Sequence, residues 1–474
     1  MCWTTASRSR WRAKSTASCS KARGATSTRG APPRCVRGSR RFPGRNASGS
    51  RRRYSCNRPG PMPRLSANSD HDGALSMSAS NIEPDFETQR VRLLRPSWAE
   101  LDYGAIAANL ALAREMVGQA TKIYFVCKGD GFGFGAAKVA RLAAQAGVDG
   151  FCVGSPEEGM AIRNAGVDRE ILLFAATLPE DAAQVAALGL TVTIQSHESL
   201  RAFIDAGVSV DAFLEIDPGF GRFGFLPSQW QAAFEALRHQ STVRLKGVYT
   251  HLSSPESDDV TRTQADVFDA ALADARAAGF DSLTTMLASS RVMLAHPHLA
   301  YRAVDPGRFL YGALDADWMA RAPLRPMLRA VRGRIIHVQE HAAGSVLGIG
   351  YAEPIRLERA VRIGVVPIGF WDGLNHVPPL GRVLVHGQTA RILGRRSFQH
   401  TVVDITENAR ARTGSVVTLL GRDGDHAITI DELAASLRLP VMELIPRLAR
   451  SLPHVDAEAT DVGGHLRPVR PSKA

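Results

Sequence analysis

The chain has 474 residues, of which 45% are hydrophobic and 22% charged, which is typical of a folded protein and excludes a wholly disordered chain. Its length predicts two folded domains, and it contains no run of about eighteen apolar residues that would predict a membrane-spanning helix. The net charge is +12, but residues 1–69 hold 17 Lys and Arg and no Asp or Glu, so the rest of the chain carries 41 basic and 46 acidic residues. A mildly acidic body does not favour nucleic acid as a partner.

Residues 1–76 are predicted to form a basic leader outside the fold. They are rich in Arg, Ser, Gly and Pro, and they have neither helical nor strand periodicity nor enough apolar surface to fold. Our first interpretation is an over-extended gene start, with Met77 as the true beginning. An organelle transit peptide and, more distantly, a nucleic-acid-binding arm are the alternatives.

Cysteine usage favours a reducing compartment, and we expect the protein in the cytoplasm. Four of the six cysteines lie in the leader, which leaves Cys127 and Cys152 in the body. Two cysteines are too few for a disulfide framework, and these two are not in metal-ligand spacing. No metal site is therefore expected.

The first half of the body alternates short apolar runs with amphipathic stretches. Strands of four to six residues separated by helices of about ten indicate β/α units around a parallel sheet. Such regularity predicts a (β/α)8 barrel over residues 95–325, and no G-x-G-x-x-G motif in Rossmann context supports a doubly wound sheet. The expected strands are 123–127, 150–153, 171–174, 191–194, 213–216 and 245–250, and the expected helices are 136–145, 156–164, 180–188, 199–206, 228–238 and 261–278.

The pattern of apolar and polar residues changes after about residue 326. Alternating apolar residues separated by Gly, Asp and Asn turns predict a mainly β domain over residues 326–460, followed by a tail, 461–474. One late helix, 429–437, is expected within it. The expected strands are 332–338, 360–367, 381–385, 388–393, 401–405 and 415–420.

Lys128 is the most conspicuous candidate for chemistry. It directly follows an expected buried strand and precedes a run with glycine at every second position, 129–135. In a barrel, catalytic groups sit at the C-terminal ends of strands. A lysine at such a place can be desolvated, which lowers its pKa and makes its amine a nucleophile toward an aldehyde. A solvated lysine beside a flexible loop is an equally good interpretation of this feature alone.

Seven motifs that follow one another in order resemble the alanine racemase family, whose members combine a barrel that binds pyridoxal 5'-phosphate (PLP) with a C-terminal β domain. The resemblance covers residues 95–458. Each motif is weak alone, whereas the series, with matching intervals, is specific. The motifs are WAELDYGAIAAN (98–109), 126–135, LEIDPGFGRFG (214–224), VYTHL (248–252), GRFLYG (307–312), GYA (350–352) and PIGFWDG (367–373).

The resemblance implies a role for each matching residue. Lys128 would be the Schiff-base lysine and one catalytic base, and Tyr351 would be the second catalytic base. Arg222 would bind substrate or brace Tyr351, and His251 would lie between Arg222 and the cofactor. Further residues implied at the cofactor are Ser290, Asp305, Gly307 and Arg308. Taken alone, Tyr351 could equally be a core tyrosine and His251 a structural histidine.

Several positions depart from the family pattern. Phe132 and Phe134 stand where the family usually has Tyr and His. Glu215 stands where many members carry a carbamylated lysine, and as an anion it could still support the substrate arginine Arg222. Phe398 replaces a methionine, and its main chain could still bind the substrate carboxylate. Asp456 replaces a tyrosine that binds phosphate, so no phosphate contact is expected there.

Asp305 is the largest departure, because an arginine that faces the pyridine nitrogen is usual at this position. The stretch 304–308, VDPGR, resembles the E-P-G-R segment of barrel-type PLP decarboxylases, in which a carboxylate pairs with the ring nitrogen and the arginine helps to hold phosphate. A carboxylate at the ring strengthens the electron sink. A loop residue that caps the following turn is the alternative interpretation of Asp305.

These observations predict a PLP-dependent amino-acid racemase with a two-base mechanism and alanine as its default substrate. The resemblance also implies a homodimer with shared active sites. The alternatives are a PLP-dependent decarboxylase or other lyase, a racemase of another amino acid, and a non-catalytic PLP-binding protein. The complete β domain that carries Tyr351 argues against the last of these.

Overall fold

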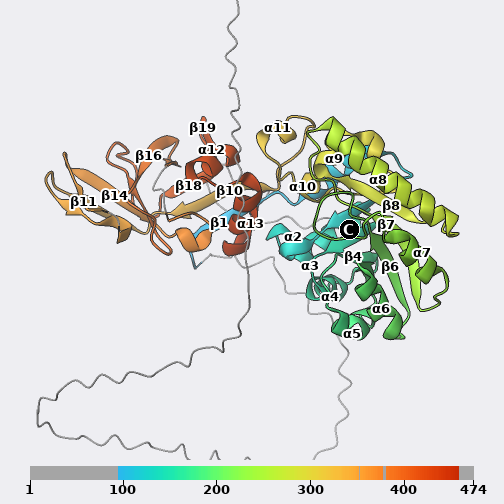
Figure 1. The fold of residues 1–474 in the computed structure, drawn as a ribbon. Coiled ribbons are helices and arrows are strands. Elements are labelled where there is room, and N and C mark those ends of the chain that lie inside the picture. The colour runs from blue at the N-terminus through green and yellow to red at the C-terminus, as the bar shows by residue number, and fades with distance from the viewer. Residues whose placement is uncertain (1–93, 352, 377–380, 458–474) are drawn as a thin grey trace, which may run out of the picture. The chain divides into compact units, whose positions relative to one another are not determined.

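The computed structural model describes residues 94–351, 353–376 and 381–457. The leader 1–76 and the tail 461–474, which were expected from the sequence, lie outside the described residues. Within the described ranges, eight parallel strands, β2 to β9, close into a barrel, and the predicted fold class is confirmed (Figure 1). The barrel strands are β2 (Lys122–Val126), β3 (Gly150–Val153), β4 (Glu170–Leu173), β5 (Thr191–Ile194), β6 (Val210–Glu215), β7 (Val243–Tyr249), β8 (Thr284–Ser289) and β9 (Ala303–Asp305).

Helices surround these strands, as Figure 1 shows. The longest, α8 (Asp258–Ala277), begins where the Ser257 side chain accepts a hydrogen bond from the Val260 N–H, which satisfies one of the free N–H groups of the first turn. Its buried residues recur at helical spacing and face the barrel. The other helices of this part are α1 (Gly104–Val117), α2 (Lys128–Phe132), α3 (Ala136–Ala146), α4 (Pro156–Asn164), α5 (Ala182–Ala186), α6 (His197–Asp205), α7 (Trp230–Arg238), α9 (Ser290–Ala295), α10 (Gly307–Leu310) and α11 (Ala316–Met319).

The barrel strands bury side chains on both faces. One set of alternate residues fills the barrel interior with Tyr124, Val126, Phe213, Tyr249 and smaller side chains. The other set packs outward against the helices, as expected of strands covered on both sides. Side chains at the last positions of the inward set reach the mouth of the barrel.

The second domain is built on a large mixed sheet. Its strand order is β11-β14-β17-β16-β15-β18-β10-β1-β20, with β19 paired to β18 and a separate hairpin of β12 and β13. The strands are β10 (Leu328–Arg334), β11 (His337–His341), β12 (Val346–Leu347), β13 (Ile355–Arg356), β14 (Val361–Val366), β15 (Arg382–Val385), β16 (Gln388–Leu393), β17 (Thr401–Asp404), β18 (Val416–Asp423), β19 (His426–Ile428) and β20 (His454–Asp456).

The first strand, β1 (Ser97–Leu101), belongs to this second sheet and corrects the predicted barrel range of 95–325. It pairs antiparallel with β10, with Ser97 opposite Gly333, and parallel with β20. Every residue of β1 is buried. The first strand of the described chain is therefore an interior strand of the C-terminal domain, next to the edge strand β20, and the chain crosses to the barrel through α1.

Two details of the second domain also differ from expectation. The expected strand 332–338 is divided between β10 and β11. The expected single helix is followed by another, so that α12 (Ile430–Leu437) precedes α13 (Val441–Ser451). Because Pro446 lies inside α13, and proline disfavours helix interiors, the sequence pattern does not predict this helix.

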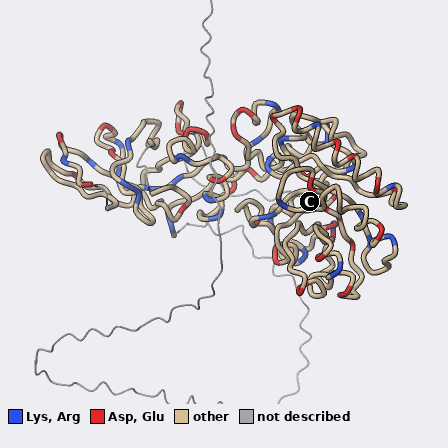
Figure 2. Tube along the Cα trace, in the orientation of Figure 1, with Lys and Arg blue, Asp and Glu red and all other residues tan. Residues whose placement is uncertain are grey.

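Basic and acidic residues are interspersed along the described chain (Figure 2). Among these residues, no helix combines the length and apolarity needed to cross a bilayer. The same residues contain no group of three or more His, Cys, Asp or Glu that could hold a metal ion.

Candidate active site

The mouth of the barrel brings together four of the residues predicted for the site. Lys128 follows β2, Glu215 ends β6, Arg222 lies on the loop after β6, and His251 lies two residues beyond β7. The carboxyl ends of parallel strands meet at one end of a barrel, and these four side chains accordingly line one pocket of about 130 Å³. The wall is completed by Gly154, Phe174, Ala175, Phe223 and Tyr249.

Lys128 opens a left-handed turn. The five residues after it, 129–133, all have φ values between 53° and 85°, a conformation that costs non-glycine residues about 1–2 kcal/mol each. Glu158 pins this turn, because its carboxylate accepts hydrogen bonds from the N–H of Asp130 at 3.0 Å and of Gly154 at 2.8 Å. The Lys128 Nζ lies 5.4 Å from the ring centroid of Phe174. Glu158 thus ties the turn that presents the Lys128 amine to Gly154, the residue that follows β3.

Glu215 is a buried carboxyl with a defined partner. The Tyr249 hydroxyl donates to Glu215 Oε2 at 2.9 Å and lies 3.2 Å from the Thr193 Oγ1. Burial raises the pKa of Glu215 to about 7, although the Tyr249 hydrogen bond and the positive charge of Arg222 act in the opposite direction. The carboxyl therefore depends on a cation at the pocket to remain ionised at neutral pH.

Arg222 is carried on a loop that one carboxylate organises. The Asp217 side chain accepts hydrogen bonds from the backbone N–H groups of residues 219–221 at 2.7–3.1 Å. The Arg222 guanidinium lies 4.7 Å from the Phe220 ring centroid and 5.3 Å from that of Phe223. A planar, exposed guanidinium on a fixed loop can bind a carboxylate with two parallel hydrogen bonds.

His251 and Asp305 form a close pair in which Asp305 is buried and His251 is partly exposed. The Asp305 Oδ2 lies 3.6 Å from the His251 Nε2, and the His251 Nδ1 is buried without a hydrogen-bond partner among the described residues. Burial, and then the charges of Lys128 and Arg222, lower the pKa of His251 to about 3. Burial raises the pKa of Asp305 to about 7, while Lys128 acts to lower it. At neutral pH the imidazole is uncharged, and among the described residues the carboxyl forms no ion pair with a Lys or Arg.

The ends of β8 and β9 place three more predicted residues beside this pair. Asp305 is opposite Ser289 in the sheet register, so Ser290 begins α9 next to it. The Ser290 Oγ accepts a hydrogen bond from the Phe309 N–H at 3.1 Å. A Cβ added at Gly307 would lie 3.1 Å from the Val126 Cβ, so a larger residue there would have to displace Val126 slightly. Burial lowers the pKa of Arg308, and the charge of Arg291 adds to this.

Phe132 and Phe134, two departures from the family pattern, pack around one tyrosine. Their ring centroids lie 5.2 Å and 5.4 Å from that of Tyr311. The Tyr311 hydroxyl donates to the Val126 carbonyl oxygen at 3.0 Å. The phenyl rings thus support the end of β2, two residues before Lys128.

Two predicted residues lie in the second domain. Tyr351 ends the short helix Ile349–Tyr351, and its side chain lies outside the described part of the structure. Phe398 is 52% exposed, stacks on Trp371 with ring centroids 5.2 Å apart and is not among the described residues that line this pocket. Within one chain, the described lining of the pocket therefore contains the lysine, the arginine and the histidine without Phe398.

Sequence reasoning missed three residues of the site. Asp217 stands two residues after Glu215 in the LEIDPGFG motif, Tyr249 is the last residue of β7, and Phe174 directly follows β4. The alternation of inward-facing positions along the barrel strands could have identified Tyr249. The backbone contacts of Asp217 have no signal in the sequence beyond the preference of Asp for turns.

Comparison with known sequences agrees with this geometry over both domains. Residues 101–315 match the family described as alanine racemase, N-terminal domain, and residues 329–456 match alanine racemase, C-terminal domain. Three relatives named alanine racemase come from Methanococcus maripaludis (26% identical, covering 76% of this chain and 98% of theirs), Nostoc sp. (30%, 76% and 95%) and Xanthomonas axonopodis pv. citri (32%, 75% and 95%).

Solved structures are similar as well. The alanine racemase from E. faecalis has a TM-score of 0.70 at 28% identity and covers 77% of this chain and 99% of its own. The biosynthetic alanine racemase from Pseudomonas aeruginosa has a TM-score of 0.66 at 29% identity, with the same coverage. The similarity extends over the barrel and the β domain together.

Proposed function

Since this chain belongs to the alanine racemase family, we propose that it is an isomerase that interconverts L- and D-alanine with PLP as its cofactor. The observation that carries this proposal is the pocket at the barrel mouth, where Lys128 shares one wall with Arg222, Glu215 and His251. An amine nucleophile and a carboxylate-binding guanidinium are the groups that an aldehyde cofactor and an amino-acid substrate require.

The residues present fit PLP. The buried Nδ1 of His251 has no hydrogen-bond partner among the described residues. Asp305 is a buried carboxyl that, among the described residues, lies in ion-pair distance of His251, which is uncharged at neutral pH, and of no Lys or Arg. Gly307 has no Cβ at a position where one would be tightly packed against Val126. Ser290 and Arg308 supply a hydroxyl and a cation for a phosphate group, and Asp305 would pair with a ring nitrogen.

When bound, PLP withdraws electrons from the substrate and makes its Cα proton acidic. The protein must then move that proton at Cα. Racemisation needs one base on each face of the substrate, and the two bases exchange the roles of acid and base with the direction of reaction.

Lys128 Nζ serves one face and the Tyr351 hydroxyl the other. Arg222 binds the substrate carboxylate and, with Glu215 as its nearby anion, keeps the substrate oriented between the two bases. Phe398 is assigned to the substrate through its main-chain N–H.

A homodimer follows from the same proposal. Phe398 is not among the described residues that line the pocket of its own chain, and in this proposal a second copy supplies it together with Tyr351. The β domain exposes an aromatic cluster in which Phe398 contacts Phe370 and Trp371, each at a ring-centroid distance of 5.2 Å. Exposed clusters of this kind are typical of protein interfaces. The partner in this proposal is therefore a second copy of the chain.

We place the enzyme in the cytoplasm. Cys127 and Cys152 are both free and buried, and the Cys127 N–H donates to the Cys152 carbonyl oxygen at 2.7 Å. Neighbouring cysteines that carry no disulfide are typical of reducing compartments.

Asp305 supports a second candidate function. A buried carboxyl at the end of β9 would stabilise a protonated ring nitrogen. More than one bond at Cα could then be broken, including the bond to the carboxylate, which gives decarboxylation. Incubating the protein with PLP and L- or D-alanine, then measuring the enantiomer ratio and carbon dioxide, separates the two functions. A racemase brings both starting enantiomers to the same mixture and releases no carbon dioxide, whereas a decarboxylase releases it in proportion to substrate consumed.

The attachment of PLP to Lys128 tests the proposal directly. Borohydride reduction of the holoenzyme followed by peptide mapping is expected to place the pyridoxyl group on Lys128. Lys122, at the other end of the same strand and exposed, provides the matched control. Lys122→Ala should retain the label, and Lys128→Ala should lose it. A label on Lys122 or Lys138, or no label at all, would contradict the proposed function.

A further inference from the structure

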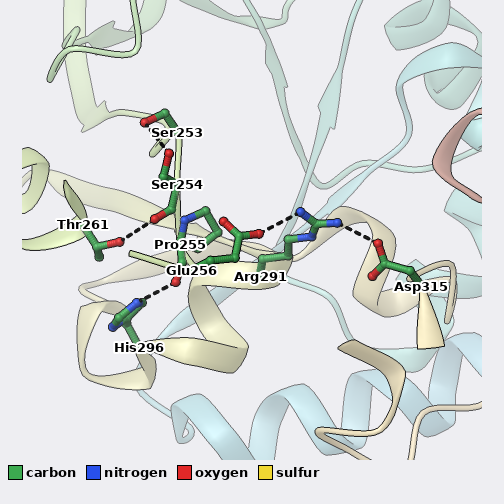
Figure 3. A network of polar contacts seen from close by, with 8 residues as sticks. All are labelled: Ser253, Ser254, Pro255, Glu256, Thr261, Arg291, His296 and Asp315. Carbon is green, nitrogen blue, oxygen red and sulfur yellow. Dashed lines mark hydrogen bonds and ion pairs between the residues drawn. The ribbon is translucent and has the colours of Figure 1, made fainter. Parts of the chain in front are cut away.

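Arg291 bridges two carboxylates beside the proposed cofactor site (Figure 3). Its Nη1 lies 3.0 Å from the Glu256 Oε1, and its Nη2 lies 2.9 Å from the Asp315 Oδ2. The Arg291 side chain is 26% exposed, and its guanidinium packs 5.3 Å from the Trp318 ring centroid. A partly buried guanidinium with two ionic partners and an aromatic neighbour holds one position.

The bridge joins the three segments that carry the proposed cofactor residues. Glu256 lies on the loop that follows His251, Arg291 is adjacent to Ser290, and Asp315 follows the helix that contains Arg308. These segments leave the barrel after the neighbouring strands β7, β8 and β9.

The loop that carries Glu256 is itself held in place. The Thr261 Oγ1 donates to the Ser254 carbonyl oxygen at 3.2 Å, and the His296 Nε2 lies 2.9 Å from the Pro255 carbonyl oxygen, as Figure 3 shows. The Ser253 N–H donates to the Gln264 side chain at 3.0 Å. Glu256 is therefore presented to Arg291 by a fixed loop.

Arg308 is the other guanidinium in this charge cluster. Its side chain has no hydrogen bond or ion pair with a residue that the structure describes, and the residue is half-buried. The charges of Arg291, Asp315 and Glu256 all act on its pKa, with Arg291 lowering it and the two carboxylates raising it. If Arg291 did not engage both carboxylates, Arg308 would be the cation available to neutralise them, and it would then lose its capacity to bind an external anion.

We propose that Arg291 is a positioning residue: by engaging Glu256 and Asp315, it keeps Arg308 available for the phosphate monoester of the cofactor. This inference rests on the proposed function, because it assumes a phosphate-bearing ligand at Arg308. It differs from a purely structural role, in which the bridge would only hold three loops together. The two roles predict different responses to removal of the carboxylates.

The test measures equilibrium binding of PLP and of pyridoxal, which lacks the phosphate, to cofactor-free protein by absorbance. Arg291→Met is expected to weaken PLP binding by about tenfold and to leave pyridoxal binding unchanged, because the loss is confined to the phosphate contact. Arg291→Lys, which keeps the charge, should recover part of the loss. The triple variant Arg291→Met, Glu256→Gln and Asp315→Asn should bind PLP nearly as the wild type does.

Equal weakening for PLP and pyridoxal, or no rescue in the triple variant, would show that the bridge is only structural and would overturn the inference. The double variant Glu256→Gln and Asp315→Asn tests it even if Arg291→Met does not fold. It should bind PLP at least as tightly as the wild type, and weaker PLP binding would count against the inference. A wild-type protein that binds no PLP would instead overturn the proposed function, and the inference with it.

Discussion

At the scale of the residue, Asp305 is the position predicted to depart most from the family pattern. Its carboxyl is buried beside an uncharged imidazole, and among the described residues it forms no ion pair with a Lys or Arg. In the proposed function the ring nitrogen of PLP becomes its partner. The side chain would then affect how strongly the cofactor withdraws electrons, and not how tightly the cofactor is bound.

The products and spectrum of Asp305 variants test this placement. If Asp305 faces the ring nitrogen, the wild type should show long-wavelength absorbance in the presence of alanine and slow transamination in addition to racemisation. Asp305→Arg should suppress both, because it restores the usual family side chain. Asp305→Ala should lower kcat by at least about tenfold while weakening PLP binding less. Unchanged spectra and products in both variants would mean that Asp305 does not touch the cofactor, and the decarboxylase alternative would lose its support.

The stability of the cofactor-free protein should depend on pH through the carboxyl of Asp305. Its pKa in the fold is about 7, above the ordinary value near 4, so between pH 4 and 7 the folded state binds more protons than the unfolded state. The free energy of unfolding therefore falls as pH rises through this window. Relative to Asp305→Asn, which does not titrate, the wild type should lose up to about 1.4 kcal/mol per pH unit.

Chemical denaturation of both proteins at pH 4.5, 5.5 and 6.5 provides the measurement. The pKa of His251 is lowered to about 3 and so changes stability in the opposite direction, but it is present in both proteins and largely cancels in the difference. Parallel pH profiles for wild type and variant would contradict the shifted pKa of Asp305.

At the scale of the element, the left-handed turn after Lys128 joins the two domains. A Cβ added at Gly133 would lie 2.6 Å from the Pro446 carbonyl oxygen and 3.0 Å from the Arg450 backbone nitrogen of α13. The φ value of Gly133 is +85°, which a side chain also disfavours. Helix α13 therefore packs against the turn through a contact that only glycine permits.

Gly133→Ala should be strongly destabilising and Gly147→Ala much less so. Gly147, like Gly133, is in the left-handed region, with φ +96° and ψ +32°, but has no neighbour within 4 Å of an added Cβ, so it isolates backbone strain, about 1–2 kcal/mol. The clash at Gly133 adds about 1–3 kcal/mol. Denaturant unfolding of the two variants measures the difference, and similar free energies of unfolding would show that the contact with α13 does not matter.

The elements that the sequence pattern predicts are those with several consecutive periodic residues. The expected strand 388–393 has the bounds of β16, and the expected helix 136–145 is close to those of α3. In contrast, β9 has three residues and α13 contains a proline. Their formation depends on pairing and packing with distant segments, which local periodicity does not report.

At the scale of the whole molecule, the proposed site is divided between two copies of the chain. Lys128 lies at the barrel pocket, and Tyr351 belongs to the second domain, at the end of the short helix Ile349–Tyr351. A two-fold dimer would place the second domain of each copy at the barrel of the other. Each active site would then need both chains.

Mixing two inactive variants tests this arrangement. Lys128→Ala chains and Tyr351→Phe chains should each be inactive alone. After mixing and exchange, a mixed dimer should regain about one intact site, since one site collects both substitutions and the other collects neither. Absence of any recovered activity, once subunit exchange has been demonstrated by mass, would mean that each site is built from one chain.

The leader is predicted to be dispensable for catalysis. Residues 1–69 contain no acidic residue, and the first family-like motif begins at Trp98. A chain that starts at Met77 should fold, bind PLP and turn over alanine within about twofold of the full chain, since it retains every residue of the proposed site. Aggregation or loss of activity in the truncated protein would contradict this prediction.

The sequence by itself determined the order of the two domains, the barrel class and the pocket lysine, because these depend on local burial patterns and on motifs of contiguous residues. The tertiary structure alone decided that β1 pairs with β10, more than two hundred residues away, that Asp217 organises the loop of Arg222, and that Arg291 joins Glu256 to Asp315. Such contacts depend on which segments the closed barrel and the large sheet bring together. Periodicity along the chain records whether a side chain is buried, but not which distant residue it meets.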